Sequence, residues 1–87
     1  MTDESLIDFP CDFPIKVMGA NCAEFEAEVI RIIRQHVPDL GEGAVRQRPS
    51  GKGNYLSITV TIRAESKTQL DALYRELTAC ELAKMVL

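Results

Sequence analysis

The sequence predicts a small domain of the α+β class, and two patterns in its apolar residues support that prediction. Within residues 55–63 apolar and polar side chains alternate strictly, and the apolar ones are Leu56, Ile58, Val60 and Ile62. Alternation of this kind is typical of a strand that buries one face and exposes the other. In residues 22–36, and again after Ser66, the apolar residues recur at helical spacing instead. We therefore expect a sheet with one face covered by two helices.

The length and the net charge limit the classes of protein to which the chain can belong. With 87 residues the chain has room for one core, and we expect an arm over residues 1–12 and a domain over residues 13–87. The net charge of −3 argues against general affinity for nucleic acid or an anionic membrane. No apolar run approaches the roughly 20 residues of a membrane span, and the acidic N-terminus does not resemble a secretory signal. These features predict a cytoplasmic protein without membrane association.

The first half of the domain is predicted to be a strand followed by a helix. Residues 13–19 alternate in the manner of a strand and close on a glycine. In residues 22–36 a single helical stripe consists of Phe25, Val29, Ile32, Ile33 and His36. Asn21 is the expected N-cap of this helix, with Glu24 three residues later in the capping-box position.

The second half adds a hairpin, a helix and a last strand. Residues 44–49 form a weak strand, which we place at a sheet edge because it contains a proline. A Ser-Gly-Lys-Gly-Asn turn joins it to the strongly alternating strand. Ser66 is expected to cap the second helix, with Gln69 completing a capping box. The buried stripe of that helix is Leu70, Leu73, Tyr74 and Leu77. Residues 82–87 form the last strand, whose outward side is Leu82, Lys84 and Val86.

The resulting order is strand, helix, strand, strand, helix, strand. This is the order of the ferredoxin-like split-βαβ motif, also called the alpha-beta plait. Right-handed crossovers then place both helices on one face of an antiparallel sheet with the strand order 4-1-3-2. The other face of that sheet is left open.

Positive charge is concentrated on the predicted sheet. No acidic residue occurs from residue 43 to residue 64, and that stretch contains Arg46, Arg48, Lys52 and Arg63. Lys16 and Lys84 occupy outward positions of the first and last strands. We therefore expect a locally positive open face on an acidic protein. Two interpretations stay open: the cations protect an exposed sheet, or they recognise an anionic ligand or an acidic partner.

No motif in the sequence indicates catalysis or metal binding. The Gly-Lys-Gly turn at residues 51–53 leads into a strand, whereas a Walker-type phosphate loop leads into a helix, so hairpin chemistry explains these glycines. Cys11, Cys22 and Cys80 are odd in number and lack metal-ligand spacing. No activating base is marked for a cysteine, and His36 has no ligand-spaced companion. We predict a protein that is not an enzyme and needs no metal or cofactor.

RNA-recognition (RRM) domains share this order of elements, which makes RNA binding an alternative function. Those domains stack bases on aromatic side chains of their two central strands. Here Tyr55 is the only candidate aromatic on the strong strand, and the first strand has no outward aromatic. The RNP1 pattern is also absent from the sequence. RNA is therefore disfavoured as a partner.

Three segments of the chain resemble the YbeD family of small bacterial proteins. They are FPCDFPIKVMG (9–19), RPSGKGNYLSITVTIRA (48–64) and LAKMVL (82–87). The resemblance implies a ferredoxin-like fold similar to the ACT-type regulatory domains of amino-acid enzymes. It implies no catalytic residues. The family carries the label of a lipoate regulatory protein, largely because its genes lie beside a lipoyl-transferase gene.

Together these observations predict a regulatory or adaptor domain that contacts a partner protein through its open sheet face, with a link to lipoate metabolism. The residues expected to bind are Lys16, Lys52, Asn54, Tyr55, Arg63 and Lys84. The cations would supply charge-assisted hydrogen bonds, and the other two residues would supply directional ones. The alternative is an ACT-like sensor that binds an amino acid or a small carboxylic acid. An outward apolar strip of Met18, Leu82 and Val86 would favour a homodimer over a monomer.

Overall fold

The structure is a computed structural model that describes residues 8–87. The elements are β1 (Cys11–Ala20), α1 (Ala23–His36), the short 3-10 helix η2 (Glu42–Ala44), β2 (Val45–Ser50), β3 (Tyr55–Ala64), α2 (Lys67–Ala79) and β4 (Ala83–Val86). Most of the predicted arm, residues 1–7, lies outside the described residues. The first strand starts at Cys11, two residues before the predicted start.

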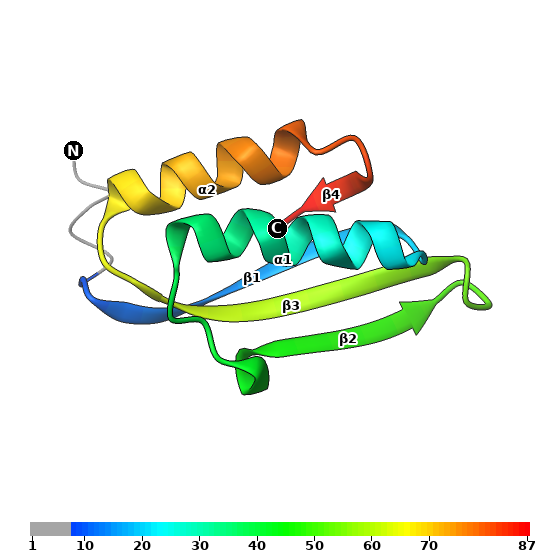
Figure 1. The fold of residues 1–87 in the computed structure, drawn as a ribbon, viewed down its shortest axis with the longest axis horizontal. Coiled ribbons are helices and arrows are strands. Elements are labelled where there is room, and N and C mark those ends of the chain that lie inside the picture. The colour runs from blue at the N-terminus through cyan, green and yellow to red at the C-terminus, as the bar shows by residue number, and fades with distance from the viewer. Residues whose placement is uncertain (1–7) are drawn as a thin grey trace.

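The strands form one antiparallel sheet in the order β2-β3-β1-β4. Counted from the other edge this is the order 4-1-3-2, so the predicted ferredoxin-like fold is confirmed. Both long helices, α1 and α2, lie side by side on one face of the sheet (Figure 1). The central strands β1 and β3 pair along ten residues, whereas β2 and β4 form the two edges.

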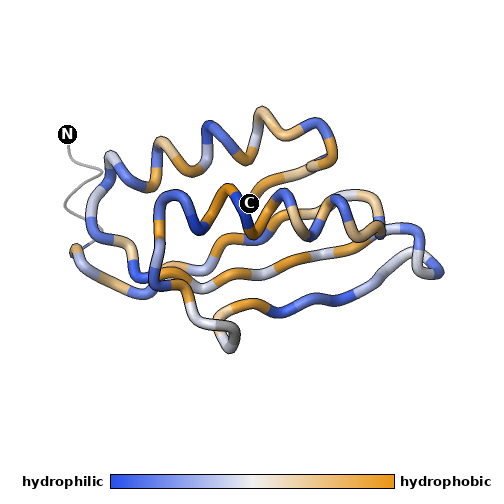
Figure 2. Tube along the Cα trace, in the orientation of Figure 1, coloured by the Kyte–Doolittle hydropathy of each residue, from blue (hydrophilic) through white to orange (hydrophobic). Residues whose placement is uncertain are grey.

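The core fills the space between the sheet and the two helices. The inward side chains of β3 that the sequence predicted are buried, and Phe25 of α1 and Leu73 of α2 are fully buried against them. Figure 2 shows hydrophobic residues along β1 and β3, whereas β2 is largely hydrophilic. Each fully buried aliphatic or aromatic side chain contributes about 1.5–3 kcal/mol to the free energy of folding. The alternation of β3 therefore supplies the floor of the core.

The two helices begin differently. Ser66 caps α2 as predicted, because its hydroxyl accepts a hydrogen bond from the backbone N–H of Gln69 at 3.1 Å. The predicted N-cap of α1 is wrong: Cys22 occupies that position, and no side-chain hydrogen bond caps the helix there. Asn21 instead donates from Nδ2 to the carbonyl of Gly53 at 2.8 Å. The asparagine thus joins the end of β1 to the β2–β3 hairpin, which its sequence position could not reveal.

The last strand pairs with β1 irregularly. Met85 lies opposite Met18, but Ala83 lies opposite Gly19, so Lys84 is an extra residue in the ladder. Such a bulge changes which residues of a strand face each side of the sheet. The simple alternation assumed for residues 82–87 is therefore broken at its centre.

This irregularity overturns the predicted outward strip of the last strand. Val86 lies opposite the fully buried Val17, and residues directly opposite each other share a face of the sheet. Val86 therefore packs against the core instead of pointing outward, and Leu82, which precedes the strand, packs against the core as well. The large apolar side chains left exposed on this strand and at the end of the chain are Met85 and Leu87. Within residues 8–87, no helix combines the length and apolar character needed to cross a membrane.

Candidate anion-binding surface on the open sheet face

The strand register brings three cations together on the face that α1 and α2 leave open. Thr59 of β3 lies opposite Lys16 of β1 on one side and opposite Arg46 of β2 on the other. In the next row Ser57 lies opposite Arg48. A hollow of ≈ 360 Å³ lies over this part of the sheet, and we call it the cationic hollow. It is lined by Lys16, Arg46, Gln47, Arg48, Ser57 and Thr59.

The cations of this hollow have no carboxylate partner among residues 8–87. Lys16, Arg46 and Arg48 are exposed, and no ion pair or side-chain hydrogen bond joins them to another described side chain. Three ammonium and guanidinium groups beside two hydroxyls offer many donors and no negative charge. An anion entering the hollow would form charge-assisted hydrogen bonds, which are about twice as strong as neutral ones. The surface is therefore suited to a carboxylate or another anionic group.

The predicted binding residues do not all meet here. Lys16 lines the hollow from β1, whereas Tyr55 lies opposite Ala20 at the hairpin end of the sheet. Arg63 lies toward the other end, where its Nη1 is 3.4 Å from Oδ1 of Asp12. That ion pair is exposed on both sides, so its contribution to stability is small. Of the six predicted residues, only Lys16 lines the cationic hollow.

The remaining predicted residues belong to the hairpin and to the bulge. Gly51, Lys52 and Gly53 all have positive φ angles of 60°, 60° and 86°, so the two glycines serve the turn. The backbone carbonyl of Asn54 accepts a hydrogen bond from the backbone N–H of Asn21 at 3.1 Å. Together with the side-chain bond of Asn21, this contact fastens the hairpin to the loop after β1. Lys84 is exposed at the bulge of β4.

Arg46 and Arg48 are site residues that the prediction omitted. The sequence contains a signal for them, which is the length of the hairpin loop. A loop of residues 51–54 places Ser50 opposite Tyr55. Counting back along the hairpin from that pair places both arginines beside the polar side of β3. The weak apolar content of β2 predicts only its edge position.

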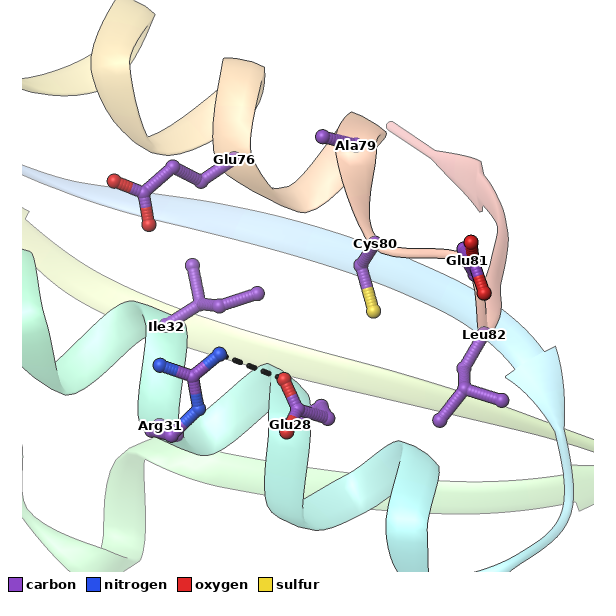
Figure 3. A pocket seen from close by; sticks show the side chains of 8 residues that line it. All are labelled: Glu28, Arg31, Ile32, Glu76, Ala79, Cys80, Glu81 and Leu82. Atoms are coloured by element: carbon purple, nitrogen blue, oxygen red, sulfur yellow. Dashed lines mark hydrogen bonds and ion pairs between the residues drawn. The ribbon is translucent and has the colours of Figure 1, made fainter.

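A second hollow, of ≈ 430 Å³, lies between the two helices and the start of β4 (Figure 3). Its charged residues are mostly acidic, and Arg31 Nη2 lies 2.7 Å from Glu28 Oε1. This ion pair lowers the pKa of Glu28 and raises the pKa of Arg31, in each case chiefly through the hydrogen bond. The side chain of Cys80 points toward this hollow, with Glu76 and Glu81 at its rim (Figure 3). This second hollow is therefore acidic where the cationic hollow is basic.

His36 is the last residue of α1, and its contacts indicate a structural role. Its Nε2 lies 3.1 Å from Glu76 Oε2 of α2 but lacks the alignment of a hydrogen bond. Its backbone carbonyl accepts a hydrogen bond from Gln69 Nε2 at 3.1 Å. Both contacts join α1 to α2. Among residues 8–87 there is no cluster of three or more histidine, cysteine or acidic residues that could hold a metal ion.

The fold and this surface define a small ferredoxin-like α+β domain with a cationic open sheet. The chain belongs to the family described as "Protein of unknown function (DUF493)", whose model matches residues 4–87. A UPF0250 protein of Janthinobacterium sp. (strain Marseille) is 52% identical over 84 residues, which cover 97% of this chain and 92% of that protein. A UPF0250 protein of Neisseria gonorrhoeae is 52% identical over 83 residues, 95% of this chain and 91% of the relative. UPF0250 is the YbeD family, so the resemblance seen in the sequence is confirmed.

Two solved structures share the fold at low sequence identity. The solution structure of protein HP0495 from H. pylori has a TM-score of 0.72 and 10% identity, covering 93% of this chain and 85% of that one. The C-terminal domain of the MgtC protein from Mycobacterium tuberculosis has a TM-score of 0.66 and 19% identity, covering 93% and 88%. At these identities the comparison establishes the arrangement of the strands and helices alone.

Proposed function

We propose that this protein is a regulatory or adaptor domain, not an enzyme, and that it binds an acidic region of a partner protein on its open sheet face. The observation that carries the proposal is the cationic hollow, where Lys16, Arg46 and Arg48 gather without a carboxylate partner among residues 8–87. Arg46 and Arg48 lie two residues apart on one face of β2, and Lys16 lies across Thr59 from Arg46, so the three positive charges repel one another. A ligand that supplies negative charge would remove that repulsion.

Other features of the molecule are consistent with recognition. The label of the YbeD family suggests lipoate metabolism as the setting in which to seek the partner. Met18 and Met85 lie opposite each other beside the hollow, so the same face offers an apolar area next to its charges. Interfaces commonly combine an apolar centre with charged groups that set orientation and partner choice.

The test is affinity capture of partners from a native lysate with matched charge reversals. Lys16→Glu and Arg48→Glu each place a negative charge in the hollow, and we expect each to reduce the captured partner at least about tenfold. Arg75→Glu changes the net charge equally at an exposed position of α2 and should leave capture unchanged. Equal capture by all three variants would show that the cationic hollow is not the binding surface.

A sensor of small acids is the second candidate, and the size of the hollow favours it. Its volume of ≈ 360 Å³ lies within the range of small-molecule sites, about 300–1,000 Å³. A ligand present at about 100 times its dissociation constant stabilises a protein by about 2.7 kcal/mol. A thermal-shift screen of amino acids and of octanoic and lipoic acids should then raise the melting temperature of the wild type and not of Lys16→Glu. No shift with any of these acids would dismiss this candidate.

A further inference from the structure

The backbone hydrogen bonds of the sheet reveal which groups of each strand point to which edge. Lys16 and Leu87 exchange two backbone hydrogen bonds, with N···O distances of 3.2 and 2.8 Å, so the backbone groups of Lys16 point toward the β4 side. Successive residues of a strand direct these groups to opposite edges. Val17 therefore points toward β3, and its partner Ile58 points back toward β1. By the same alternation, Thr59 points toward β2.

The pattern also shows which backbone groups lie on the outer edge of β2. Arg46 lies opposite Thr59 and so directs its backbone groups to β3, which leaves Val45, Gln47 and Pro49 directed outward. A proline at such a position costs nothing in the ladder, because its missing N–H would have had no partner in the sheet. The outward edge therefore offers an N–H and a C=O from Val45 and from Gln47, and a C=O from Pro49.

A hollow lies on each side of this edge, and Gln47 lines both of them. On the open face is the cationic hollow. On the helix side a hollow of ≈ 290 Å³ lies between α1 and β2, lined by Glu26, Ile30, Arg34, Val45 and Gln47. Ile30 and Val45 are half-buried and supply its apolar lining. The hydrogen bond from Gln47 Nε2 to Glu26 Oε2 occupies that carboxylate.

We propose that the partner supplies an extended segment of alternating acidic and apolar residues, which adds to β2 as a further antiparallel strand. Its acidic side chains would lie beside Arg46 and Arg48 on the open face, and its apolar side chains would enter the helix-side hollow next to Ile30 and Val45. Strand addition obtains affinity from backbone hydrogen bonds and specificity from alternate side chains. This inference rests on the proposed function and specifies the form that the acidic partner takes.

The same edge is unsuited to pairing with a second copy of itself. Antiparallel pairing of two β2 strands would bring Arg46 and Arg48 of one copy beside the arginines of the other, and like charges facing across strands are destabilising. Pro49 also removes one donor from the edge. Charges and prolines on edge strands are common protection against self-association. The charge that excludes a second copy is the charge that would attract an acidic strand.

The probe is a short blocked peptide in which Glu and Val alternate, and its binding to the full chain is measured by titration calorimetry. A peptide in which Lys and Val alternate is the control for charge. In the proposed geometry the Val amides face β2 and the Glu amides face solvent. Methylation of the Val amides should therefore weaken binding at least about tenfold, and methylation of the Glu amides should leave it within about twofold. Equal binding of the two methylated peptides, or of the Glu and Lys peptides, would overturn the proposal.

Three variants of the chain test the edge itself. Gln47→Pro removes an outward N–H and should weaken binding of the Glu-Val peptide about tenfold, whereas Gln47→Ala keeps that N–H and controls for the lost bond to Glu26. Pro49→Ala adds a donor to the edge and should tighten binding, which provides a reading even where Gln47→Pro fails to fold.

The outcomes separate the two proposals. If Arg48→Glu abolishes binding of the peptide while the Gln47→Pro, Pro49→Ala and methylation arms change nothing, the charge recognition stands and the added strand is wrong. If Arg48→Glu leaves binding of the Glu-Val peptide unchanged, acidic recognition at the hollow is itself wrong, and the proposed function fails together with the inference.

Discussion

The two faces of the sheet differ in how their side chains find partners. On the face covered by the helices, Ile58 and Val60 of β3 are fully buried in an apolar core. On the open face, Ser57 and Thr59 of the same strand lie among cations that have no counter-charge among residues 8–87. One strand therefore serves both faces through alternate residues. Substitutions one position apart on β3 should therefore alter the core and the open face separately.

The largest expected effect is the loss of a core side chain from β3. Ile58→Ala should lower the free energy of unfolding by about 2–5 kcal/mol, because it removes buried methyl groups and leaves a cavity. Thr59→Ala, one residue away on the open face, should change it by less than about 1 kcal/mol. Urea unfolding of both variants measures the difference. Similar losses in the two variants would mean that the faces are not energetically distinct.

A second prediction concerns the covered side of β1. A Cβ atom on Gly19 would lie 2.3 Å from the backbone oxygen of Leu82 and 2.7 Å from the ring of Phe25. Gly19→Ala should therefore cost about 1–3 kcal/mol through overpacking against a backbone atom that cannot rotate away. Gly41→Ala is the control, because a Cβ atom on Gly41 would meet no other atom within 4 Å. A melting temperature lower for Gly41→Ala than for Gly19→Ala would contradict this packing.

The third prediction separates stability from binding on the open face. Arg46→Gln removes one of three neighbouring positive charges, so the free energy of unfolding should stay within about 0.5 kcal/mol of the wild type or rise slightly. Binding of the Glu-Val peptide should weaken, and its dependence on salt should become shallower. Calorimetry at low and high salt measures both. A clear loss of stability in Arg46→Gln would show that the arginine supports the fold.

The smallest expected effect concerns the acidic hollow between the two helices. The pKa of Glu28 is below its ordinary value, chiefly because Arg31 donates a hydrogen bond to it. A carboxyl group with a lowered folded-state pKa stabilises the protein above the ordinary glutamate pKa, and this stabilisation is lost as the pH falls through the folded value.

Glu28→Gln should thus lower the melting temperature slightly at neutral pH and not at all under strongly acidic conditions. Glu24→Gln, on the same helix and exposed, is the control. A difference between wild type and Glu28→Gln that persists in acid would exclude the ion pair as its cause.

Sequence patterns predicted the structure correctly where the feature depends on residues within one helix or strand. The alternation of residues 55–63 predicted the inward face of β3, and Ser66 predicted the start of α2. Both depend on neighbours within one strand or one turn. The N-cap of α1 was mispredicted, because Asn21 bonds to Gly53, which is distant in the sequence and adjacent only after the hairpin folds back.

By itself, the sequence determined the ferredoxin-like order of elements, the buried side of β3 and the positive charge of the open sheet, because periodicity and composition are local properties. The tertiary structure decided which cations meet. Register across three strands placed Arg46 beside Thr59 and Lys16, and the bulge at Lys84 turned Val86 inward. The hairpin loop fixes the register of β2 against β3, whereas the registers of β1 against β3 and of β4 against β1 depend on strands that are distant in the sequence.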